Sequence, residues 1–295
     1  MTELMQAIVR GLGQGSVYAL LAIGFVIIYK SMRVISFAQP AFMLAGATLV
    51  SYLVVELNFF LAVVLATVLV ALLGVGVERA ALRPMIGKPV FVISIITLGV
   101  DVVIRVVVNG YIGINVRQVG DPWGLRTVTL LGIAVEQRYL AMFLTTMVLL
   151  AVLFAFFRYS RMGLAMRATA LDQEVALAQG VSVGWVFALS WAIAAAMAAI
   201  AGVFVASGAG LDQGLWIVAL KALPVIILGG LDSLGGALVA GLAIGVVEAL
   251  VASYGTDISP HLDGDFALVS PYIVMMLVLL VRPYGLFGTR EVERV

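Results

Sequence analysis

The sequence predicts an all-α protein that crosses a membrane about eight or nine times, and three observations lead to this prediction. The 295-residue chain is 63% hydrophobic and only 11% charged, whereas soluble domains are about 45–50% apolar. Polar breaks divide the chain into apolar segments of about 20 residues, the length that a helix needs to cross a bilayer. The net charge is only +1 and no basic cluster is apparent, so nucleic acid is excluded as a partner.

We expect these segments to form a single transmembrane domain over residues 1–295. They lie at about residues 9–29, 34–56, 59–79, 90–110, 138–157, 184–207, 215–230, 235–254 and 268–283. The first has no obvious cleavage site, so we expect it to be retained. The second and seventh contain Pro40 and Pro224, and proline removes a helical hydrogen bond. Interrupted helices are tolerated in a membrane where they are buried or line a cavity, which makes Gln39, Pro40 and Pro224 candidates for the translocation path.

The distribution of Lys and Arg predicts the orientation. With the N-terminus outside, eleven of the 17 basic residues fall on the cytoplasmic side, as the positive-inside rule favours. The C-terminus is then cytoplasmic, and the longer loops at about 111–137 and 255–267 face outward. The stretch GGLDSLGG, residues 229–236, becomes a cytoplasmic turn. Gly230 and Gly235 would make it a tight hairpin, because glycine accepts positive φ freely.

Small residues occur at every fourth position of three segments, including Gly11 and Gly15 in the first and Gly241 and Gly245 in the eighth. This spacing lets neighbouring helices approach closely, and packing within one subunit is a common use of it. We therefore interpret these stripes as packing surfaces.

Four charged residues fall within or near the ends of predicted spans, where they are expensive and often functional. Asp101 and Arg105 are four residues apart, so they share one helix face and can neutralise each other. Lys221 and Glu248 fall toward the outer ends of neighbouring spans. They could pair with each other, extend to the membrane interface or meet a zwitterionic substrate, and a proton relay is a further alternative.

Sequence motifs for catalysis are absent. The chain has neither a Gly-x-Ser-x-Gly elbow nor a His-Glu-x-x-His helix, so we expect no catalytic residue and no enzymatic activity. GGLDSLGGA lacks the Gly-Lys-Ser/Thr ending of a phosphate-binding loop, so any ATP would be bound by another subunit. Cys is absent and the single His is His261, so we expect no metal and no cofactor in this chain.

A polar stretch between the fifth and sixth segments interrupts the apolar pattern. From Arg158 to Val186 it reads RYSRMGLAMRATALDQEVALAQGVSVGWV, and about residues 163–181 can form an amphipathic helix that cannot span. Its apolar positions lie three or four residues apart and form a packing stripe: Leu164, Ala168, Leu171, Val175 and Ala178. Arg167, Asp172 and Glu174 would face solvent. A helix that only caps the bundle at the interface would show the same amphipathicity.

Several motifs together resemble a known family. Glu174, Ala176 and Gly180 resemble the Glu-Ala-Ala-x-x-x-Gly loop of ABC importer permeases, with Val175 in place of the first Ala. The opening GLGQGSVYALLAIGFVIIYKSMRVISFAQPAF is similar to that of branched-chain amino acid permeases, in which an Asn-Phe-Ala segment begins the second span. The RPMIGKP loop and the C-terminal RPYGLFG fit the same family, and the resemblance covers essentially the whole chain.

The resemblance implies a bacterial or archaeal cytoplasmic-membrane permease of an ABC importer for branched-chain or other small apolar amino acids. Its implied partners are ATP-binding subunits holding ATP and Mg, a second permease subunit and an extracytoplasmic binding protein. The implied contact with the ATPase comprises Arg167, Asp172, Glu174, Ala176 and Gly180. The implied path includes Ser36 and Phe37, although Ser36-Phe37-Ala38-Gln39-Pro40 departs from the usual Asn-Phe-Ala-His-Gly. A urea or amide permease of the same family, an ion-coupled secondary transporter and a passive channel remain alternatives.

Overall fold

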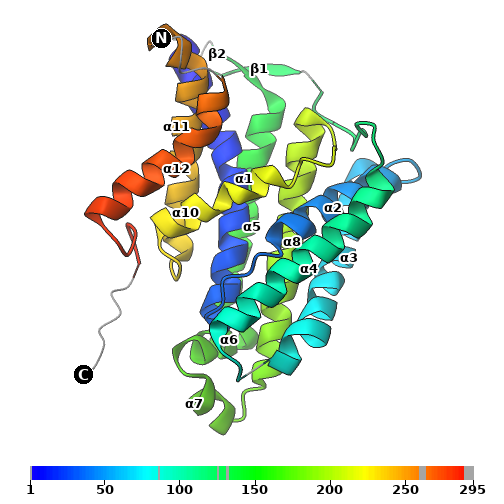
Figure 1. Cartoon of the computed structure of the whole chain (residues 1–295). Coiled ribbons are helices and arrows are strands. Elements are labelled where there is room, and N and C mark those ends of the chain that lie inside the picture. The colour runs from blue at the N-terminus through cyan, green and yellow to red at the C-terminus, as the bar shows by residue number, and fades with distance from the viewer. Residues whose placement is uncertain (1, 86, 125, 131–132, 259–263, 289–295) are drawn as a thin grey trace. The chain divides into compact units, whose positions relative to one another are not determined.

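The computed structural model describes residues 2–85, 87–124, 126–130, 133–258 and 264–288, which are mostly helical (Figure 1). The long helices are α1 (Thr2–Met32), α3 (Phe59–Val77), α4 (Val90–Ile112), α5 (Gln137–Tyr159), α8 (Val183–Ala209) and α11 (Leu234–Ile258). The shorter ones are α2 (Gln39–Leu53), α6 (Arg161–Leu171), α7 (Gln173–Ala178), α9 (Ile217–Leu220), α10 (Ala222–Gly229) and α12 (Gly264–Val281). A π-helix, η1 (Glu78–Leu82), and a 3-10 helix, η2 (Arg83–Met85), continue α3.

Six of the described helices are long and apolar enough to cross a membrane, which confirms a polytopic helical membrane protein. Each of the nine predicted segments contains a helix, but α2, α9 with α10, and the described part of α12 are shorter than a typical span. The predicted count of eight or nine spans therefore stays a prediction. Much of α1 and α8 is buried, whereas α3, α4 and α5 expose most of their apolar side chains, as expected of surfaces that meet lipid.

The structure corrects the all-α expectation at one place. In the loop predicted at 111–137, β1 (Thr127–Leu130) pairs antiparallel with β2 (Ile133–Glu136), with Thr127 opposite Glu136. β-branched residues recur in both strands, and such residues favour extended backbone. The hydropathy pattern that identified the spans carried no information about these strands, because each has only four residues.

The described residues divide into two compact units that are interleaved along the sequence. The prediction of a single domain over 1–295 stays a prediction. Unit 2 comprises residues 27–122 and 147–219. In it α8 packs against α2 and α3, and α4 packs against α2. Trp191 of α8 is fully buried, with its ring 6.1 Å from that of Phe42 and nearly perpendicular to it.

Small residues allow these close contacts in unit 2. A Cβ added at Gly74 of α3 would lie 2.7 Å from the carbonyl oxygen of Trp191. Gly46 of α2 and Gly202 of α8 meet the backbones of Ala199 and Met43 in the same way. Side chains at these positions would force the helices apart.

Unit 1 comprises residues 1–26, 123–146 and 220–295, apart from those that lie outside the described ranges. Here α11 packs against α10 and α12. The predicted stripes meet: a Cβ at Gly11 of α1 would lie 2.6 Å from the Cα of Val246, and Gly15 faces the backbone of Gly241. After α12, the amide of Leu286 donates to the carbonyl of Leu228 in α10 at 2.8 Å.

The glycine-rich stretch 229–236 forms the tight turn expected between α10 and α11. Gly230 has φ of 98°, and its amide donates to the carbonyl of Ile226 at 2.9 Å. Gly229 and Gly236 lie with their backbones in contact, so neither has room for a side chain. Gly235, in contrast, faces open space, which corrects its predicted role in the turn: it starts α11 without any steric need for glycine.

Candidate functional site

The polar stretch after α5 forms two short helices rather than the single helix predicted over 163–181. The Oγ of Ser160 accepts from the amide of Gly163 at 2.8 Å and begins α6. Asp172 then leaves helical geometry, with φ of −155° and ψ of 115°. Its Oδ1 accepts from the amides of Glu174 and Val175, both at 2.9 Å. Asp is a strong N-cap because its side chain competes for backbone donors, so Asp172 ends one helix and begins the next.

α7 ends at Ala178, and Gly180 follows two residues later with φ of 82°. The amide of Gly180 donates to the carbonyl of Leu177, and that of Val181 donates to the carbonyl of Ala176, both at 3.0 Å. This geometry resembles a helix ending in which glycine takes the left-handed position. Gly180 is therefore required by its backbone angle, although no neighbouring atom blocks a side chain there.

The predicted apolar stripe is largely not covered by the described part of this chain. Leu164, Leu171 and Val175 are 60%, 89% and 57% exposed. The side chains of this segment that are buried are instead small or flexible: Gly163, Met166, Thr169 and Ala176. Helical spacing alone identifies a stripe but cannot say which neighbour covers it.

Arg167, Asp172 and Glu174 are exposed, as expected, and Ala176 is buried. The segment is also attached to α1, because the amide nitrogen of Gln173 donates to the carbonyl of Ser31 at 3.1 Å. For the proposal below we call the exposed side of this segment the coupling surface. Its exposed residues include Leu164, Arg167, Leu171, Asp172, Glu174, Val175, Leu177 and Gly180, whereas Ala176 of the predicted contact is buried.

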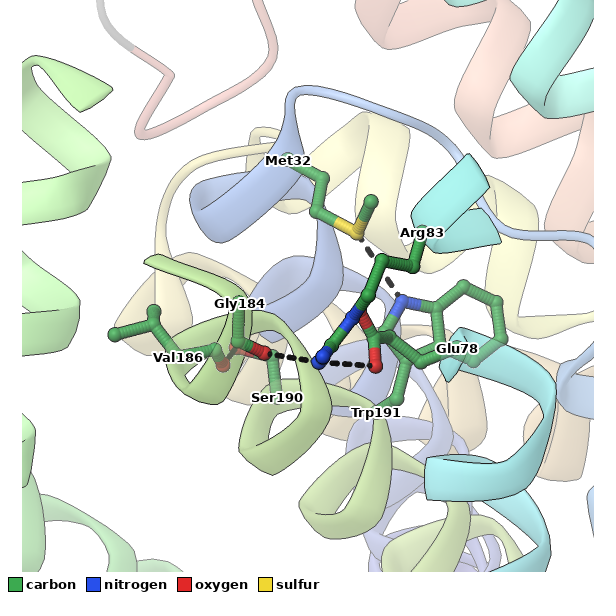
Figure 2. A network of polar contacts seen from close by, with 7 residues as sticks. All are labelled: Met32, Glu78, Arg83, Gly184, Val186, Ser190 and Trp191. Carbon is green, nitrogen blue, oxygen red and sulfur yellow. Dashed lines mark hydrogen bonds and ion pairs between the residues drawn. The ribbon is translucent and has the colours of Figure 1, made fainter. Parts of the chain in front are cut away.

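A polar network that the sequence did not reveal lies at the start of α8 (Figure 2). The Arg83 guanidinium donates to both carboxylate oxygens of Glu78, at 3.1 and 3.0 Å, and to the carbonyl of Gly184 at 2.8 Å. Glu78 is completely buried although it belongs to the π-helix that ends α3. The indole nitrogen of Trp191 donates to the sulfur of Met32 at 3.3 Å. The π-helix is the local feature that could have pointed to this network, because such turns are frequent at functional sites. It cannot be identified from the sequence.

The N-terminus of α2 lies inside unit 2 and is held by Asp101 of α4. Asp101 Oδ1 accepts from the amide of Ala41 at 3.1 Å, and Oδ2 accepts from the guanidinium of Arg105 at 2.7 Å. The guanidinium carbon of Arg105 lies 4.0 Å from the ring centre of Trp216. The structure thus contains the ion pair that the spacing indicated. It adds that the pair caps a helix N-terminus, where a negative charge is favourable.

The predicted path residues lie at this helix start. Ser36 is fully buried and its Oγ accepts from the amide of Ala38 at 3.3 Å, while the amide of Phe37 donates to Thr97 at 3.0 Å. Pro40 lies in the first turn of α2 rather than inside a helix, where proline costs no helical hydrogen bond. Pro224 likewise lies in the first turn of α10, so the interruption that it was expected to cause falls at Lys221.

Gln39 is the unusual residue of this group. Its side chain is completely buried, and neither its amide nitrogen nor its amide oxygen has a hydrogen-bond partner among the described residues. Buried polar atoms are rarely left unpaired, and each exception requires an explanation. Whether these residues line a path stays a prediction.

Unit 1 brings Lys221 and Glu248 together. The Lys221 ammonium donates to Oε1 of Glu248 and lies 3.4 Å from the hydroxyl of Tyr18 in α1. Both charged residues are 7% exposed. Of the alternatives that the sequence left open for these residues, the structure shows direct pairing. His261 lies outside the described residues.

This geometry defines the class: a multi-pass helical membrane protein with short interrupted helices and buried ion pairs, typical of transporters. The family described as the permease component of the branched-chain amino acid transport system matches residues 7–281. The chain belongs to this family.

Relatives of this family align with the chain over nearly its full length. The high-affinity branched-chain amino acid transport system permease protein LivH of Salmonella typhimurium is 31% identical, over 99% of this chain and 97% of its own. BraD of Pseudomonas aeruginosa, named for the same transport system, is 28% identical over 99% and 98%. The probable permease LivH of Methanocaldococcus jannaschii is 25% identical over 91% and 88%.

The fold is also similar to a solved structure, described as PsaBC from Streptococcus pneumoniae in complex with Fab. The TM-score is 0.51 over 96% of this chain and 93% of that one, at 13% identity. At this identity the likeness supports the fold alone.

Proposed function

We propose that this chain is the membrane-spanning subunit of an ABC importer that moves branched-chain or other small apolar amino acids into the cell. The observation that carries the proposal is family membership over residues 7–281, together with relatives named for branched-chain amino acid transport. Separate subunits bind ATP with Mg and hydrolyse it. A second permease subunit, identical or homologous, completes the pathway, and an extracytoplasmic binding protein delivers the substrate.

The coupling surface is the proposed docking site for the ATP-binding subunit. It combines exposed apolar side chains, with Leu171 89% and Leu177 64% exposed, and the exposed charges of Arg167 and Glu174. Contiguous exposed apolar side chains mark interaction sites, and neighbouring charges select the partner. Gln173 at the start of α7 donates to Ser31 of α1, and Arg83 of η2 donates to Gly184 at the start of α8, the helix that follows this segment.

The proposed mechanism is alternating access. Closure of two ATPases around nucleotide moves the coupling surfaces, and the helices attached to them follow. Nucleotide supplies the driving force because it binds the two conformations with different affinity. We also propose that the N-terminus lies outside and the C-terminus in the cytoplasm, in a bacterial or archaeal cytoplasmic membrane. With this orientation Arg79, Arg83, Lys88, Arg158, Arg161 and Arg167 all lie on the cytoplasmic side, as the positive-inside rule favours.

Charge reversal of Glu174 tests the coupling surface. Glu174→Arg is expected to weaken capture of the ATPase by about tenfold, corresponding to about 1.4 kcal/mol, and to abolish uptake without lowering permease abundance. Glu56→Arg, an exposed charge reversal in the α2–α3 loop, is the matched control and is expected to change neither. ATPase co-purification is measured beside membrane abundance. Full co-purification and uptake in Glu174→Arg would contradict the docking proposal.

Uptake in vesicles separates the rival functions. For an ABC importer, uptake of leucine requires ATP and all partner subunits. Uptake that follows an ion gradient without ATP would identify a secondary transporter, and downhill flux without either would identify a channel. Uptake of urea or amides in preference to leucine would identify the amide permeases of the same family.

A further inference from the structure

Three side chains of unit 1, from α1, from α11 and from the break before α10, meet in a buried cluster. Lys221 lies in the break directly before α10, Glu248 belongs to α11, and Tyr18 lies near the middle of α1 (Figure 1). The Lys221 ammonium donates to Glu248 Oε1 and lies 5.6 Å from the ring centre of Tyr18. Tyr18 is 4% exposed, and both charged residues are 7% exposed. The cluster is therefore buried inside unit 1.

Only one of the two carboxylate oxygens of Glu248 accepts a hydrogen bond from a described residue. Its Oε2 is buried and has no hydrogen-bond partner within the described part of the chain. In Asp101 of unit 2, by contrast, Oδ1 accepts from a backbone amide and Oδ2 accepts from Arg105. The Asp101 pair is thus fully satisfied as a helix cap, while the Glu248 pair retains an unused acceptor. An unpaired buried acceptor is costly, and a further donor at this oxygen would remove that cost.

Stability alone gives little reason for a lysine and a glutamate at these positions. A buried ion pair is often no more stabilising than well-packed apolar residues of the same volume. Charged residues within a membrane are expensive and usually mark substrate pathways. In transporters, substrate sites are commonly formed where a helix is interrupted, and Lys221 occupies such an interruption between α9 and α10.

We propose that Lys221, Glu248 and Tyr18 form a binding site for the charged head of an α-amino acid zwitterion. The ligand's ammonium donates to Oε2 of Glu248, and its carboxylate accepts from the Lys221 ammonium and from the Tyr18 hydroxyl. The ligand replaces one ion pair by two, so no net charge is added to the site. Val225 lies one turn after Lys221, and Ile244 lies one turn before Glu248; both are buried and provide apolar contacts for the ligand's side chain.

This inference rests on the proposed function, because it assigns a site to the amino acid that the importer would carry. It adds that the permease itself binds both charged groups of the substrate, the ammonium and the carboxylate. Selectivity would then not depend on the extracytoplasmic binding protein alone.

The experiment measures ligand binding to the assembled importer in lipid nanodiscs without its binding protein. Three probes share one apolar side chain: L-leucine, L-leucinamide, which lacks the carboxylate, and 4-methylpentanoate, which lacks the ammonium. Apparent affinities come from the rise of the thermal unfolding midpoint with ligand concentration. Leucine is expected to bind at least about tenfold more tightly than either analogue, because a site built for a polar group rejects a ligand that lacks it.

Two single variants test which residue binds the ligand's ammonium and which binds its carboxylate. Glu248→Gln is expected to remove the preference for leucine over 4-methylpentanoate, and Lys221→Gln to remove the preference over leucinamide. Glu136→Gln is the matched control, because it neutralises the carboxylate of another unit 1 ion pair, with Arg138 at 2.9 Å. This control is expected to keep both preferences.

A double variant that removes both charges controls for misfolding caused by an unpaired buried charge. Lys221→Met combined with Glu248→Leu is expected to keep the unfolding midpoint of the unliganded protein while abolishing leucine binding. A purely structural pair predicts lower midpoints in the single variants with both preferences unchanged. That result would overturn the proposal, as would a wild-type importer that does not distinguish the three probes.

ATP-driven uptake with the binding protein present tests the proposed function separately. Uptake of leucine by an importer whose nanodisc form does not distinguish the probes would overturn this site and leave the function standing. Discrimination among the probes without ATP-dependent uptake would leave the site standing and overturn the function.

Discussion

Two adjacent glycines in the first turn of α11 differ in whether they leave room for a side chain. A side chain at Gly236 would collide with the backbone of Gly229, whereas Gly235 is exposed and meets no atom within 4 Å. The sequence shows both residues in one motif, GGLDSLGG, and cannot separate them. Likewise, Asp172 looks like one polar residue of an amphipathic helix, but its side chain bonds two backbone amides and divides that helix.

Alanine at the two glycines is expected to have opposite effects. Gly236→Ala should destabilise the permease by about 1–3 kcal/mol, the usual cost of overpacking. Gly235→Ala should be neutral or stabilising by up to about 1 kcal/mol, because alanine favours the helix more than glycine does. Thermal unfolding of the purified permease measures both. Equal destabilisation by the two substitutions would contradict the close packing of α10 on α11.

At the scale of elements, α2 is a short helix that begins inside the protein. Asp101 neutralises its N-terminus, and the buried amide of Gln39 in its first turn lacks a partner among the described residues. A helix that starts in the interior needs such polar neighbours, because its first amides have no partner within the helix. In this conformation the start of α2 therefore has polar side chains of the kind that line an internal site. The side chain of Gln39 is nevertheless not accessible to solvent.

Cysteine labelling tests whether this helix start faces the translocation path. The chain has no native Cys, so Gln39→Cys is a unique label. It is expected to resist a small water-soluble thiol reagent in the conformation described and to react in another nucleotide state of the assembled importer. Ile114→Cys, at a residue that is 97% exposed, is the control and should react in every state. Protection of Gln39→Cys in all states would exclude it from the path.

At the scale of the whole molecule, the distribution of basic residues predicts the topology. Lys88 and Ile114 are exposed at opposite ends of α4. The positive-inside rule places Lys88 in the cytoplasm, and a single crossing by α4 then places Ile114 outside.

A membrane-impermeant thiol reagent on intact cells is expected to label Ile114→Cys and to spare Lys88→Cys. The second variant should become reactive only after the membrane is permeabilised, which also controls for its intrinsic reactivity. The opposite pattern would invert the topology and move the coupling surface to the outside of the cell, where no ATPase could bind it.

The sequence by itself determined the membrane class, the family and the approximate position of each apolar helix. Hydropathy is a local property, and helices in lipid must satisfy their own backbone groups, so the length of an apolar run nearly dictates its structure. The spacing of Asp101 and Arg105 indicated their ion pair for the same local reason.

The tertiary structure decided every feature that depends on residues far apart in the chain. Asp101 caps a helix whose first residues lie 60 positions earlier in the chain. Lys221 pairs with Glu248, one of several arrangements that the sequence allowed. The apolar stripe of α6 and α7 faces outward because Gly163 and Ala176, not the leucines, make the close contacts. Periodicity shows that a helix has two faces, but only packing against distant segments determines which face is covered.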